Sequence, residues 1–528
     1  MTDIDIISDQ ASALAAPVRV LALAPADASS TSGPRLLQPA TDLPGLDEQA
    51  LTRLAQDLGF QAGADEVLRL PAAGLPGGVG CPEGSVLLVG TGPAWDQAED
   101  SGRDSAALGV TRLQVLRQAA GRAVRVLADC PEACLLLPAD TEAELAAVLE
   151  GALIGSYAWS GSSTTAPRPL GRVVVLSSLA SSTQTTALLH RCQVLAEAVC
   201  LTRDLVNEPP NRLNPVTFTQ RATELADSMG LEVLVRDEAR LAAEGFGGIL
   251  GVGQGSAVPP RLVRLGWQPA DAGPGVPHVA LIGKGITFDS GGLSLKPAGS
   301  MPEMKSDMAG AATVLAVVQA AARLRLPVRL TAWLALAENM PGAAAQRPSD
   351  IVTMVNGTTV EITNTDAEGR LVMADALSQA VSEAPDLVLD VATLTGAQEI
   401  ALGSRVTGVM GTPVLRDQVV ACAQEVGESA WPMPLPEDMR SRLDSPYADL
   451  RNADTGSRLG GMLLAGLFLR EFVAGRTWAH LDIAGPAFNG EAPWGLSTTG
   501  GTGACVSTLL RLLERCTAPE AATAQDAR

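Results

Sequence analysis

The chain has 528 residues, of which 46% are hydrophobic and 18% charged, and its formal net charge at pH 7 is −20. This apolar content excludes a disordered or fibrous protein, and the length favours two domains over one. The negative charge disfavours binding to nucleic acid or to anionic membranes, and aromatic residues, at 3%, offer few platforms for base stacking.

The first part of the chain alternates short β-rich apolar runs with Ala- and Leu-rich helical stretches, a pattern that is typical of an α/β domain. Strands are expected at residues 18–24, 86–90, 124–128, 135–137 and 172–176, with a loop rich in Ser, Thr and Pro at 160–169 before the last of them. The acidic N-terminus does not resemble a signal peptide, and the longest uncharged apolar stretch, 308–322, is too short to cross a bilayer. We therefore expect a cytoplasmic protein.

A helix is expected at residues 183–206, and it ends before Pro209 and Pro210, which cannot continue it. We expect this helix to connect two domains. The predicted organisation is an N-terminal α/β domain at 1–182 with a role in oligomerisation or regulation, a second domain at 183–517 and a flexible tail at 518–528.

The second domain is also predicted to be α/β, and each domain is expected to hold a mixed or mostly parallel sheet flanked by helices. Its strands are expected at 231–235, 262–267, 279–283, 328–336, 387–391 and 406–410, with helices at 309–323 and 371–382. In open α/β sheets, ligands bind at the carboxyl ends of strands, so the turns after these strands are the candidate positions for chemistry.

Lysine is almost absent from the chain. The three lysines, Lys284, Lys296 and Lys305, lie in one short window, and arginine supplies the positive charge elsewhere. Arginine does not lose its proton in proteins, whereas lysine does so when it is buried or lies next to a cation. The window therefore predicts a site that needs an amine lone pair or a compact ammonium, and the alternative is a chance cluster of surface lysines.

Four carboxylates accompany these lysines in two short segments flanked by apolar sequence. Asp289 and Asp307 lie in the lysine window, and Asp366 and Glu368 lie in the segment Asn-Thr-Asp-Ala-Glu-Gly-Arg that ends at Arg370. Asp366, Glu368 and Arg370 share one side if the backbone is extended, which would direct two carboxylates at a cation and Arg370 at a neighbouring anion. Burying this much charge is costly unless the charges pair or hold metal.

Two interpretations of these charges remain open at this point. Four carboxylates suit a pair of divalent ions such as Mg²⁺ or Mn²⁺, and a neutral lysine ligand would shift the preference toward Zn²⁺, Mn²⁺ or Co²⁺. The alternative is a buried network of salt bridges between domains.

Three segments, 283–296, 305–311 and 364–371, resemble the signature of the leucyl aminopeptidase family of dinuclear metallopeptidases, in which N-T-D-A-E-G-R-L is highly specific. The resemblance continues through segments 338–341, 390–397 and 478–485, and it covers about residues 184 to 515. The first domain matches only in its arrangement, so the resemblance implies least about its role.

The resemblance implies two divalent metal ions, Mn or Zn, and a role for each residue of the site. One ion is held by Lys284, Asp289, Asp307 and Glu368, and an exchangeable one by Asp289, Asp366 and Glu368 together with the Asp366 carbonyl. In the family Lys296 polarises the scissile carbonyl, and Arg370 holds a bicarbonate that acts as general base. Met304, Thr393 and Gly396 match positions that line the pocket for the first side chain, although Met304 and Thr393 could equally be packing residues.

The function that the resemblance implies is removal of an apolar N-terminal residue, preferably Leu or Met, from short peptides by a cytoplasmic homo-hexamer. Gly466 stands where the family usually has Ala, which leaves the size of the pocket open. One alternative is a dinuclear hydrolase acting on another substrate class, such as phosphoesters. A second is a DNA-binding regulator of the same family, which the charge of −20 disfavours.

Other motifs predict less. The glycine-rich segment 245–256 does not match G-x-G-x-x-G, so a dinucleotide site is not expected there. His190 and His480 are interpreted as structural rather than as metal ligands. The eight cysteines lack the spacing of a zinc tetrad and are expected to be free thiols.

Overall fold

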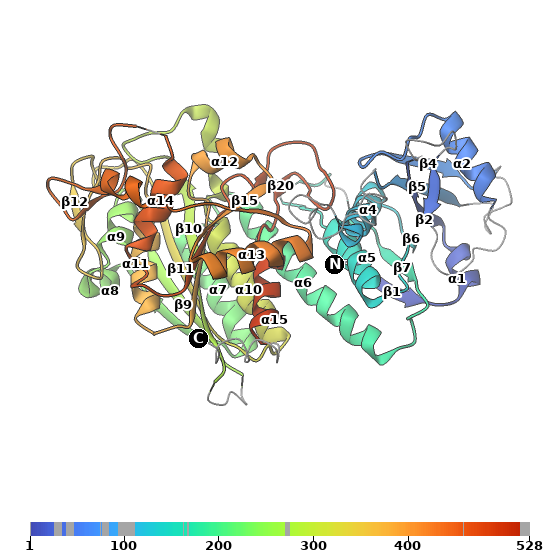
Figure 1. The fold of residues 1–528 in the computed structure, drawn as a ribbon, viewed down its shortest axis with the longest axis horizontal. Coiled ribbons are helices and arrows are strands. Elements are labelled where there is room, and N and C mark those ends of the chain that lie inside the picture. Colours follow the sequence, from blue (N-terminus) through green and yellow to red (C-terminus); the bar gives the residue numbers. More distant parts are fainter. Residues whose placement is uncertain are drawn as a thin grey trace. The chain divides into compact units, whose positions relative to one another are not determined.

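The computed structural model describes residues 2–25, 34–37, 47–73, 75, 84–92, 111–161, 163–165, 168–269, 275–457 and 459–517. The chain divides into two units (Figure 1). Unit 1 comprises Met1–Glu197 and Glu491–Thr498, and unit 2 comprises Ala198–Gly490 and Thr499–Arg528. The division falls within helix α6 (Thr183–Asn207). The tail predicted at 518–528 lies outside the described residues.

Unit 1 contains one sheet in which most neighbouring strands are parallel. The strands are β1 (Asp3–Ile7), β2 (Val18–Ala24), β3 (Arg35–Leu37), β4 (Val67–Pro71), β5 (Ser85–Gly90), β6 (Glu132–Leu136) and β7 (Arg172–Leu176). Their order is β1-β7-β6-β2-β5-β4, with β3 beside β2. Among the described strands, β3 is antiparallel to β2 and β4 is antiparallel to β5, and the other neighbouring strands are parallel. The helices are α1 (Gln10–Ala15), α2 (Glu48–Asp57), α4 (Arg112–Val126) and α5 (Glu142–Gly155).

One predicted strand of unit 1 is wrong. Residues 124–126 close helix α4, and Leu127 follows as its C-cap. The buried residues Leu116, Ala120, Ala123 and Leu127 recur every three or four positions, which is the period of a helix face. The side chain of Thr111 caps the helix by accepting the Gln114 N–H. The short Val-containing run at 124–128 was therefore the end of a longer helical pattern.

Unit 2 is built on an eight-stranded mixed sheet. The strands are β8 (Glu232–Arg236), β9 (Arg261–Trp267), β10 (His278–Asp289), β11 (Arg329–Asn339), β14 (Leu387–Ala392), β15 (Val406–Gly411), β16 (Ser429–Pro432) and β18 (Trp478–Asp482). Their order is β16-β15-β18-β14-β10-β11-β9-β8, and the four strands from β18 to β11 are mutually parallel. The prediction of an α/β fold with mixed or mostly parallel sheets is confirmed.

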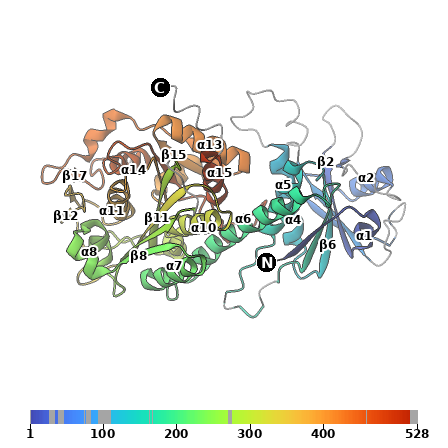
Figure 2. The ribbon, with the colours of Figure 1, turned by 90° about the horizontal axis from the view of Figure 1, so that it is seen from below.

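Helices cover both faces of this sheet (Figures 1 and 2). One group is α7 (Pro215–Met229), α10 (Ala309–Arg323), α13 (Pro413–Val426) and α15 (Val506–Cys516), and the other is α8 (Glu238–Glu244), α9 (Gly247–Gly253), α11 (Gly369–Val381) and α14 (Gly461–Arg470). Side chains of the second group pack with Trp333 and Ile282 of the sheet in one core. On the other face a Cβ at Gly283 would lie 2.5 Å from Ala311 Cα, so α10 rests directly on β10.

Smaller elements surround the sheet. A three-stranded sheet contains β12 (Ile351–Thr353), β13 (Thr359–Glu361) and β17 (Leu450–Arg451), and a two-stranded one contains β19 (Phe488–Asn489) and β20 (Gly500–Gly501). The remaining elements are η2 (Ala298–Ser306), α12 (Gly396–Leu402) and η3 (Glu437–Leu443). Within the described ranges, none of the helices has the length and apolar character needed to span a bilayer. The seven cysteines of these ranges are free thiols.

A β-bulge near the end of β10 determines which side chains meet at the edge of the sheet. The register between β10 and β11 shifts between Ile286 and Phe288, so that Asp289 lies opposite Asn339. Lys284 and Asp289 are five residues apart and would point to opposite faces of a regular strand. The extra residue reverses the alternation beyond it, so both side chains face the same side.

Candidate metal centre

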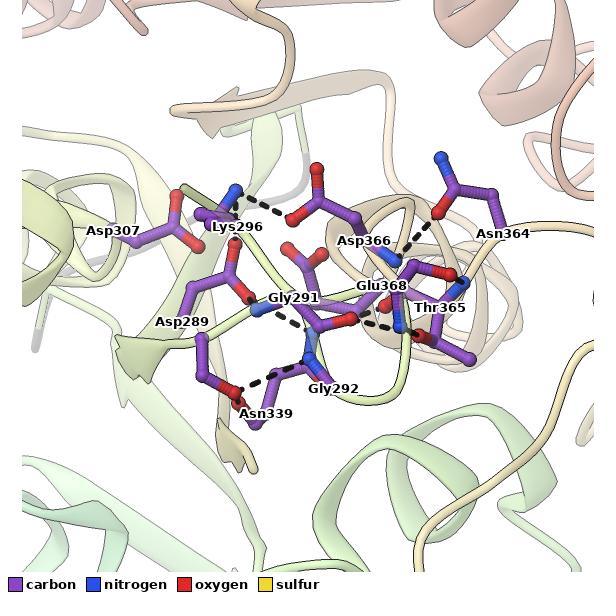
Figure 3. A network of polar contacts seen from close by, with 12 residues as sticks. Asp289, Gly291, Gly292, Lys296, Asp307, Asn339, Asn364, Thr365, Asp366 and Glu368 are labelled. Atoms are coloured by element: carbon purple, nitrogen blue, oxygen red, sulfur yellow. Dashed lines mark hydrogen bonds and ion pairs between the residues drawn. The ribbon is translucent and has the colours of Figure 1, made fainter. Parts of the chain in front are cut away.

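Four segments of unit 2 contribute to one cluster of charged side chains at the carboxyl ends of parallel strands (Figure 3). Strand β10 contributes two of them and the loop after it a third, the junction of η2 and α10 contributes one, and the loop between β13 and α11 contributes two. The six residues are Lys284, Asp289, Lys296, Asp307, Asp366 and Glu368. The structure therefore brings together the five residues predicted as metal ligands and the predicted catalytic lysine.

Lys284 lies at the centre of one half of the cluster. Its Nζ is 2.7 Å from Asp307 Oδ2 and 2.9 Å from Glu368 Oε1, and it donates to the Thr393 carbonyl at 2.9 Å. The side chain is buried, with 3% of its surface exposed. Burial lowers the pKa of Lys284, but Asp307 and Glu368 raise it by more, so beside these carboxylates alone the amine is an ammonium.

Lys296 occupies the other half. Its Nζ lies between two carboxylates, 2.8 Å from Asp289 Oδ2 and 2.7 Å from Asp366 Oδ1 (Figure 3). Burial lowers the pKa of Lys296, but the charges of Asp289, Glu368 and Asp307 together raise it by more. Lys296 is therefore protonated, and its ammonium joins the β10 loop to the loop before α11.

The carboxylates carry more negative charge than the lysines satisfy. One oxygen each from Asp289, Asp366 and Glu368 lie within 4.8 Å of one another. Burial and the charge of Glu368 raise the pKa of Asp289, burial and Asp289 raise that of Asp366, and burial raises that of Asp307 well above its ordinary value. Among the described residues, the buried Glu368 Oε2 has no hydrogen-bond partner. An arrangement of this kind is stabilised by added positive charge.

The loop that carries Asp366 and Glu368 is not extended, which corrects the geometry assumed from the sequence. Asn364 forms a turn: its Oδ1 accepts the Asp366 N–H at 3.0 Å, and its carbonyl accepts the Ala367 N–H at 3.2 Å. Glu368 has helical angles, φ −74° and ψ −37°, and α11 begins at the next residue. The two carboxylates meet because the chain turns into a helix between them and not because they alternate along a strand.

Asn339 is a residue of this site to which the sequence analysis assigned no role. Its Nδ2 donates to Asp289 Oδ1 at 2.8 Å and to the Thr365 carbonyl at 3.0 Å, so it joins the end of β10 to the loop before α11. The side chain is buried. Its position at the end of β11, the strand next to β10, was a signal in the sequence that it lies near the site. Its pairing with Asp289, however, depends on the bulge in β10.

Arg370 lies in the first turn of α11, two residues after Glu368, and is buried. Its Nη1 donates to the Asn452 carbonyl at 2.6 Å, and its Cζ lies 6.0 Å from the centroid of the Phe468 ring. Burial lowers the pKa of Arg370 to about 10, although Glu368 opposes this. A buried cation of this kind is stabilised by an anion beside it.

The three residues predicted to line a substrate pocket have different positions. Thr393 belongs to the cluster, since its hydroxyl donates to Asp307 Oδ1 at 2.7 Å. Met304 is half-buried in η2, and Gly396 is exposed at the start of α12, where an added Cβ would meet nothing within 4 Å. At Gly466 a Cβ would lie 2.8 Å from Met410 Sδ and 2.8 Å from Leu435 Cδ2, so neighbouring side chains fill the space that an alanine methyl would take.

Lys305 and His480 lie outside the cluster. Lys305 donates to the Asn207 carbonyl at 2.8 Å. His480, on β18, is fully buried, and its Nδ1 lies 2.5 Å from Asp390 Oδ1 on the adjacent strand β14. Trp478 donates to the other oxygen of Asp390 at 2.6 Å.

Comparison with known proteins shows which family this sequence resembles. The profile described as "Cytosol aminopeptidase family, catalytic domain" matches residues 200–510. A probable cytosol aminopeptidase of Micrococcus luteus is 52% identical over 500 residues, which cover 91% of this chain and 93% of the relative. One from Streptomyces avermitilis is 49% identical over 472 residues, which cover 88% and 89%.

A solved structure is also similar over nearly the whole chain. The bottromycin maturation enzyme BotP, in complex with Mn, is 37% identical and has a TM-score of 0.78. The similarity covers 96% of this chain and 100% of that one.

Proposed function

Because this chain belongs to the cytosol aminopeptidase family, we propose that it is a metal-dependent aminopeptidase that removes an apolar residue, preferably Leu, from the N-terminus of short peptides. The observation that carries the proposal is the buried cluster at the carboxyl ends of β10, β11 and β14, in which carboxylates outnumber lysines. Such an excess of buried negative charge suits divalent cations.

The residues of the cluster fit two divalent ions, which we propose to be Mn²⁺ or Zn²⁺. Asp289, Asp366 and Glu368 offer oxygens within 4.8 Å of one another, and Glu368 Oε2 is buried without a hydrogen-bond partner in the described part of the chain. Lys284 and Asp307 would complete the ligands of one ion. Positive charge near an amine lowers its pKa, so the ammonium of Lys284 would lose its proton on binding metal. The similar BotP structure was solved with Mn.

Bound divalent cations would supply Lewis acidity and lower the pKa of water at the site. The residues of the chain perform the other tasks. The ammonium of Lys296, held by Asp289 and Asp366, stabilises negative charge that develops on the carbonyl oxygen of the scissile peptide bond. Asn339 fixes the orientation of Asp289 by donating to its second oxygen.

We assign Arg370 the binding of a bicarbonate that serves as general base. Its guanidinium is buried, and burial lowers its pKa to about 10. A small anion beside a buried cation stabilises the charge of that cation. Guanidinium groups bind planar oxyanions through paired N–H donors. The bicarbonate would accept a proton from water, a task for which the cluster supplies no histidine.

The preference for apolar residues rests on Met304, Thr393 and Gly396, which we propose line the pocket for the first side chain. Gly396 borders open space, and Met304 supplies apolar surface. Since Met410 and Leu435 fill the space beside Gly466, replacement of the usual Ala there does not by itself enlarge the pocket. We also propose that the protein works in the cytoplasm as a homo-hexamer and that unit 1 serves oligomerisation or regulation.

The test is hydrolysis of leucine p-nitroanilide by purified protein that has been stripped with a chelator and then supplied with Mn²⁺ or Zn²⁺. The proposal predicts no turnover after chelation and recovery with either or both metals. Turnover that is unaffected by chelation would contradict it.

A panel of substrates separates this function from the alternative dinuclear hydrolase. We expect the metal-loaded protein to cleave leucyl and methionyl anilides at least tenfold faster than glycyl or glutamyl anilides. It should not cleave bis-p-nitrophenyl phosphate. Faster cleavage of the phosphodiester would reassign the substrate class while leaving the metal centre in place.

A further inference from the structure

Asp375, in helix α11, is a buried carboxylate that both the sequence analysis and the proposed mechanism leave without a task. None of its surface is exposed. Its Oδ2 accepts the Ile249 N–H at 2.9 Å, and its Oδ1 accepts the Val355 N–H at 2.9 Å. Both oxygens are thus used by backbone groups, one in α9 and one in the turn between β12 and β13.

Two glycines of the glycine-rich segment 245–256, Gly247 and Gly248, lie beside this contact. A Cβ at Gly248 would lie 2.6 Å from the Leu371 carbonyl and 3.0 Å from Asp375 Oδ2, and a Cβ at Gly247 would lie 2.1 Å from the Thr353 carbonyl. The two glycines therefore let the start of α9 pack against α11 and β12 at a distance that no other residue permits. This segment, which does not match G-x-G-x-x-G, donates the Ile249 N–H to an internal carboxylate.

The position of Asp375 in the chain connects it with the metal centre. Its hydrogen bond to Val355 joins residues that are 20 positions apart, and the segment between them contains β13, the loop with Asp366 and Glu368, and Arg370. The bond therefore fixes the two ends of the segment that carries two of the six cluster residues, Asp366 and Glu368. The bond to Ile249 attaches the same point to α9, which lies outside that segment.

We propose that Asp375 is a positioning residue for the metal centre, holding α11 against α9 and the β12–β13 turn so that Glu368 and Arg370 keep their places. This inference rests on the proposed function, because it assumes that the cluster binds metal. The hydrogen bonds of Asp375 go to Ile249 and Val355 and not to the six residues of the cluster. Asp375 therefore acts on the cluster only through the backbone of α11.

The role requires that both oxygens of Asp375 accept hydrogen bonds from backbone N–H groups. Burial raises the pKa of Asp375 to about 7, and backbone N–H groups of Val355, Ile249 and Gly248 oppose the rise. Asparagine has the same shape but presents an NH₂ group to one of these N–H donors, so it breaks one bond and adds a repulsion between donors. Asp375→Asn therefore removes the function with the least change in volume.

The experiment is a calorimetric titration of metal-stripped protein with Mn²⁺, performed on wild type, Asp375→Asn and the matched control Leu377→Ala. Leu377 is a fully buried residue of the same helix, and its truncation leaves a cavity without touching the carboxylate. We expect Asp375→Asn to weaken Mn²⁺ binding about tenfold, the lower end of what outer residues of metal sites contribute, and Leu377→Ala to bind like wild type. Saturating Mn²⁺ should restore most leucyl anilide turnover in Asp375→Asn.

The outcomes distinguish this inference from the proposed function. Wild type that binds no Mn²⁺ contradicts the proposed function. Wild type that binds Mn²⁺ while Asp375→Asn binds it equally well overturns the inference alone. Equal weakening in Asp375→Asn and Leu377→Ala also overturns it, because the effect would then be general destabilisation of α11.

A measurement on wild type keeps the inference testable if Asp375→Asn does not fold. If the metal centre and the Asp375 contacts are coupled, Mn²⁺ must stabilise those contacts by reciprocity. Backbone hydrogen exchange in residues 247–254 should then slow on addition of Mn²⁺, while exchange in α5 of unit 1 should not change. Unchanged exchange in residues 247–254 would overturn the inference.

Discussion

Gly369 approaches the side chain of Lys284 so closely that any larger residue at position 369 would displace the end of that side chain. A Cβ at position 369 would lie 2.5 Å from Lys284 Cε and 2.6 Å from its Nζ. Gly369 is the first residue of α11, and it lies where the Lys284 amine contacts both Asp307 and Glu368. The requirement for glycine comes from this contact and not from the turn, because its φ is not in the left-handed region.

Gly369→Ala should therefore impair the metal centre through Lys284. The end of the Lys284 side chain is flexible and would move away, which costs it the contacts with Asp307 and Glu368. Alanine is favoured over glycine in a helix by up to about 1 kcal/mol, but breaking a buried ion pair costs more, so the melting temperature of the metal-free protein should also fall. We expect a loss of leucyl anilide turnover of at least about tenfold. Gly299→Ala is the control, since its Cβ meets nothing within 4 Å, and normal turnover in a folded Gly369→Ala would contradict the assignment of Lys284.

Asn339→Ala tests whether orientation of Asp289 matters for metal binding. The substitution removes the N–H donor to Asp289 Oδ1 and the bond to the Thr365 carbonyl. Residues that orient metal ligands in this way typically contribute about 10–100-fold to metal affinity or activity. Titration of the stripped variant with Mn²⁺ should show weaker binding within this range. An affinity equal to that of wild type would mean that Asp289 is held in place without Asn339.

Lys296→Met and Lys296→Arg test the catalytic role of the ammonium. Methionine keeps the length of the side chain without charge, and arginine keeps the charge but spreads it over a planar group that does not fit the single position between Asp289 and Asp366. Both variants should bind Mn²⁺ and lose about 10²–10³-fold in kcat, the usual effect of removing one donor that stabilises an oxyanion. If Lys296→Met keeps its kcat within a factor of three or so of wild type, charge stabilisation by this residue is not part of the reaction.

Elements with a continuous apolar pattern could be predicted from the sequence. The run of Ala and Val at 309–323 predicts a helix, and α10 has the same bounds; the strand predicted at 406–410 is β15 with one further residue. The error at 124–128 has a definite cause, because a short run of strand-forming residues lay inside a longer helical period. Local propensity was outweighed there by the burial of one helix face.

The charged cluster could be predicted from composition, but its geometry could not. The density of carboxylates around Lys284 and Lys296 identified the segments that the structure brings together. The contacts of Asn339 and Asp375 depend on the register of β10 with β11 and on the packing of α9, which join residues 50 and 126 positions apart. The bulge that sets this register involves one extra residue, and no local signal in the sequence marks it.

The contact between His480 and Asp390 should make the stability of the protein depend on pH, whether or not metal is bound. Burial lowers the pKa of His480, but the charge and hydrogen bond of Asp390 raise it by more. The stabilisation from this pair is fully present below the unfolded pKa of about 6.5 and is lost as the pH rises through the higher folded value. Urea unfolding should therefore show a larger advantage of wild type over His480→Gln at pH 6 than at pH 9. An equal advantage at both values would mean that folding does not raise the pKa of His480.

The most direct test of the metal centre is a crystal structure of the Mn²⁺-loaded protein with anomalous difference maps recorded on both sides of the Mn absorption edge. We expect two anomalous peaks enclosed by Asp289, Asp366 and Glu368, with Lys284 and Asp307 bound to one of them. Maps without peaks at this cluster in protein that is active and saturated with Mn²⁺ would contradict this expectation.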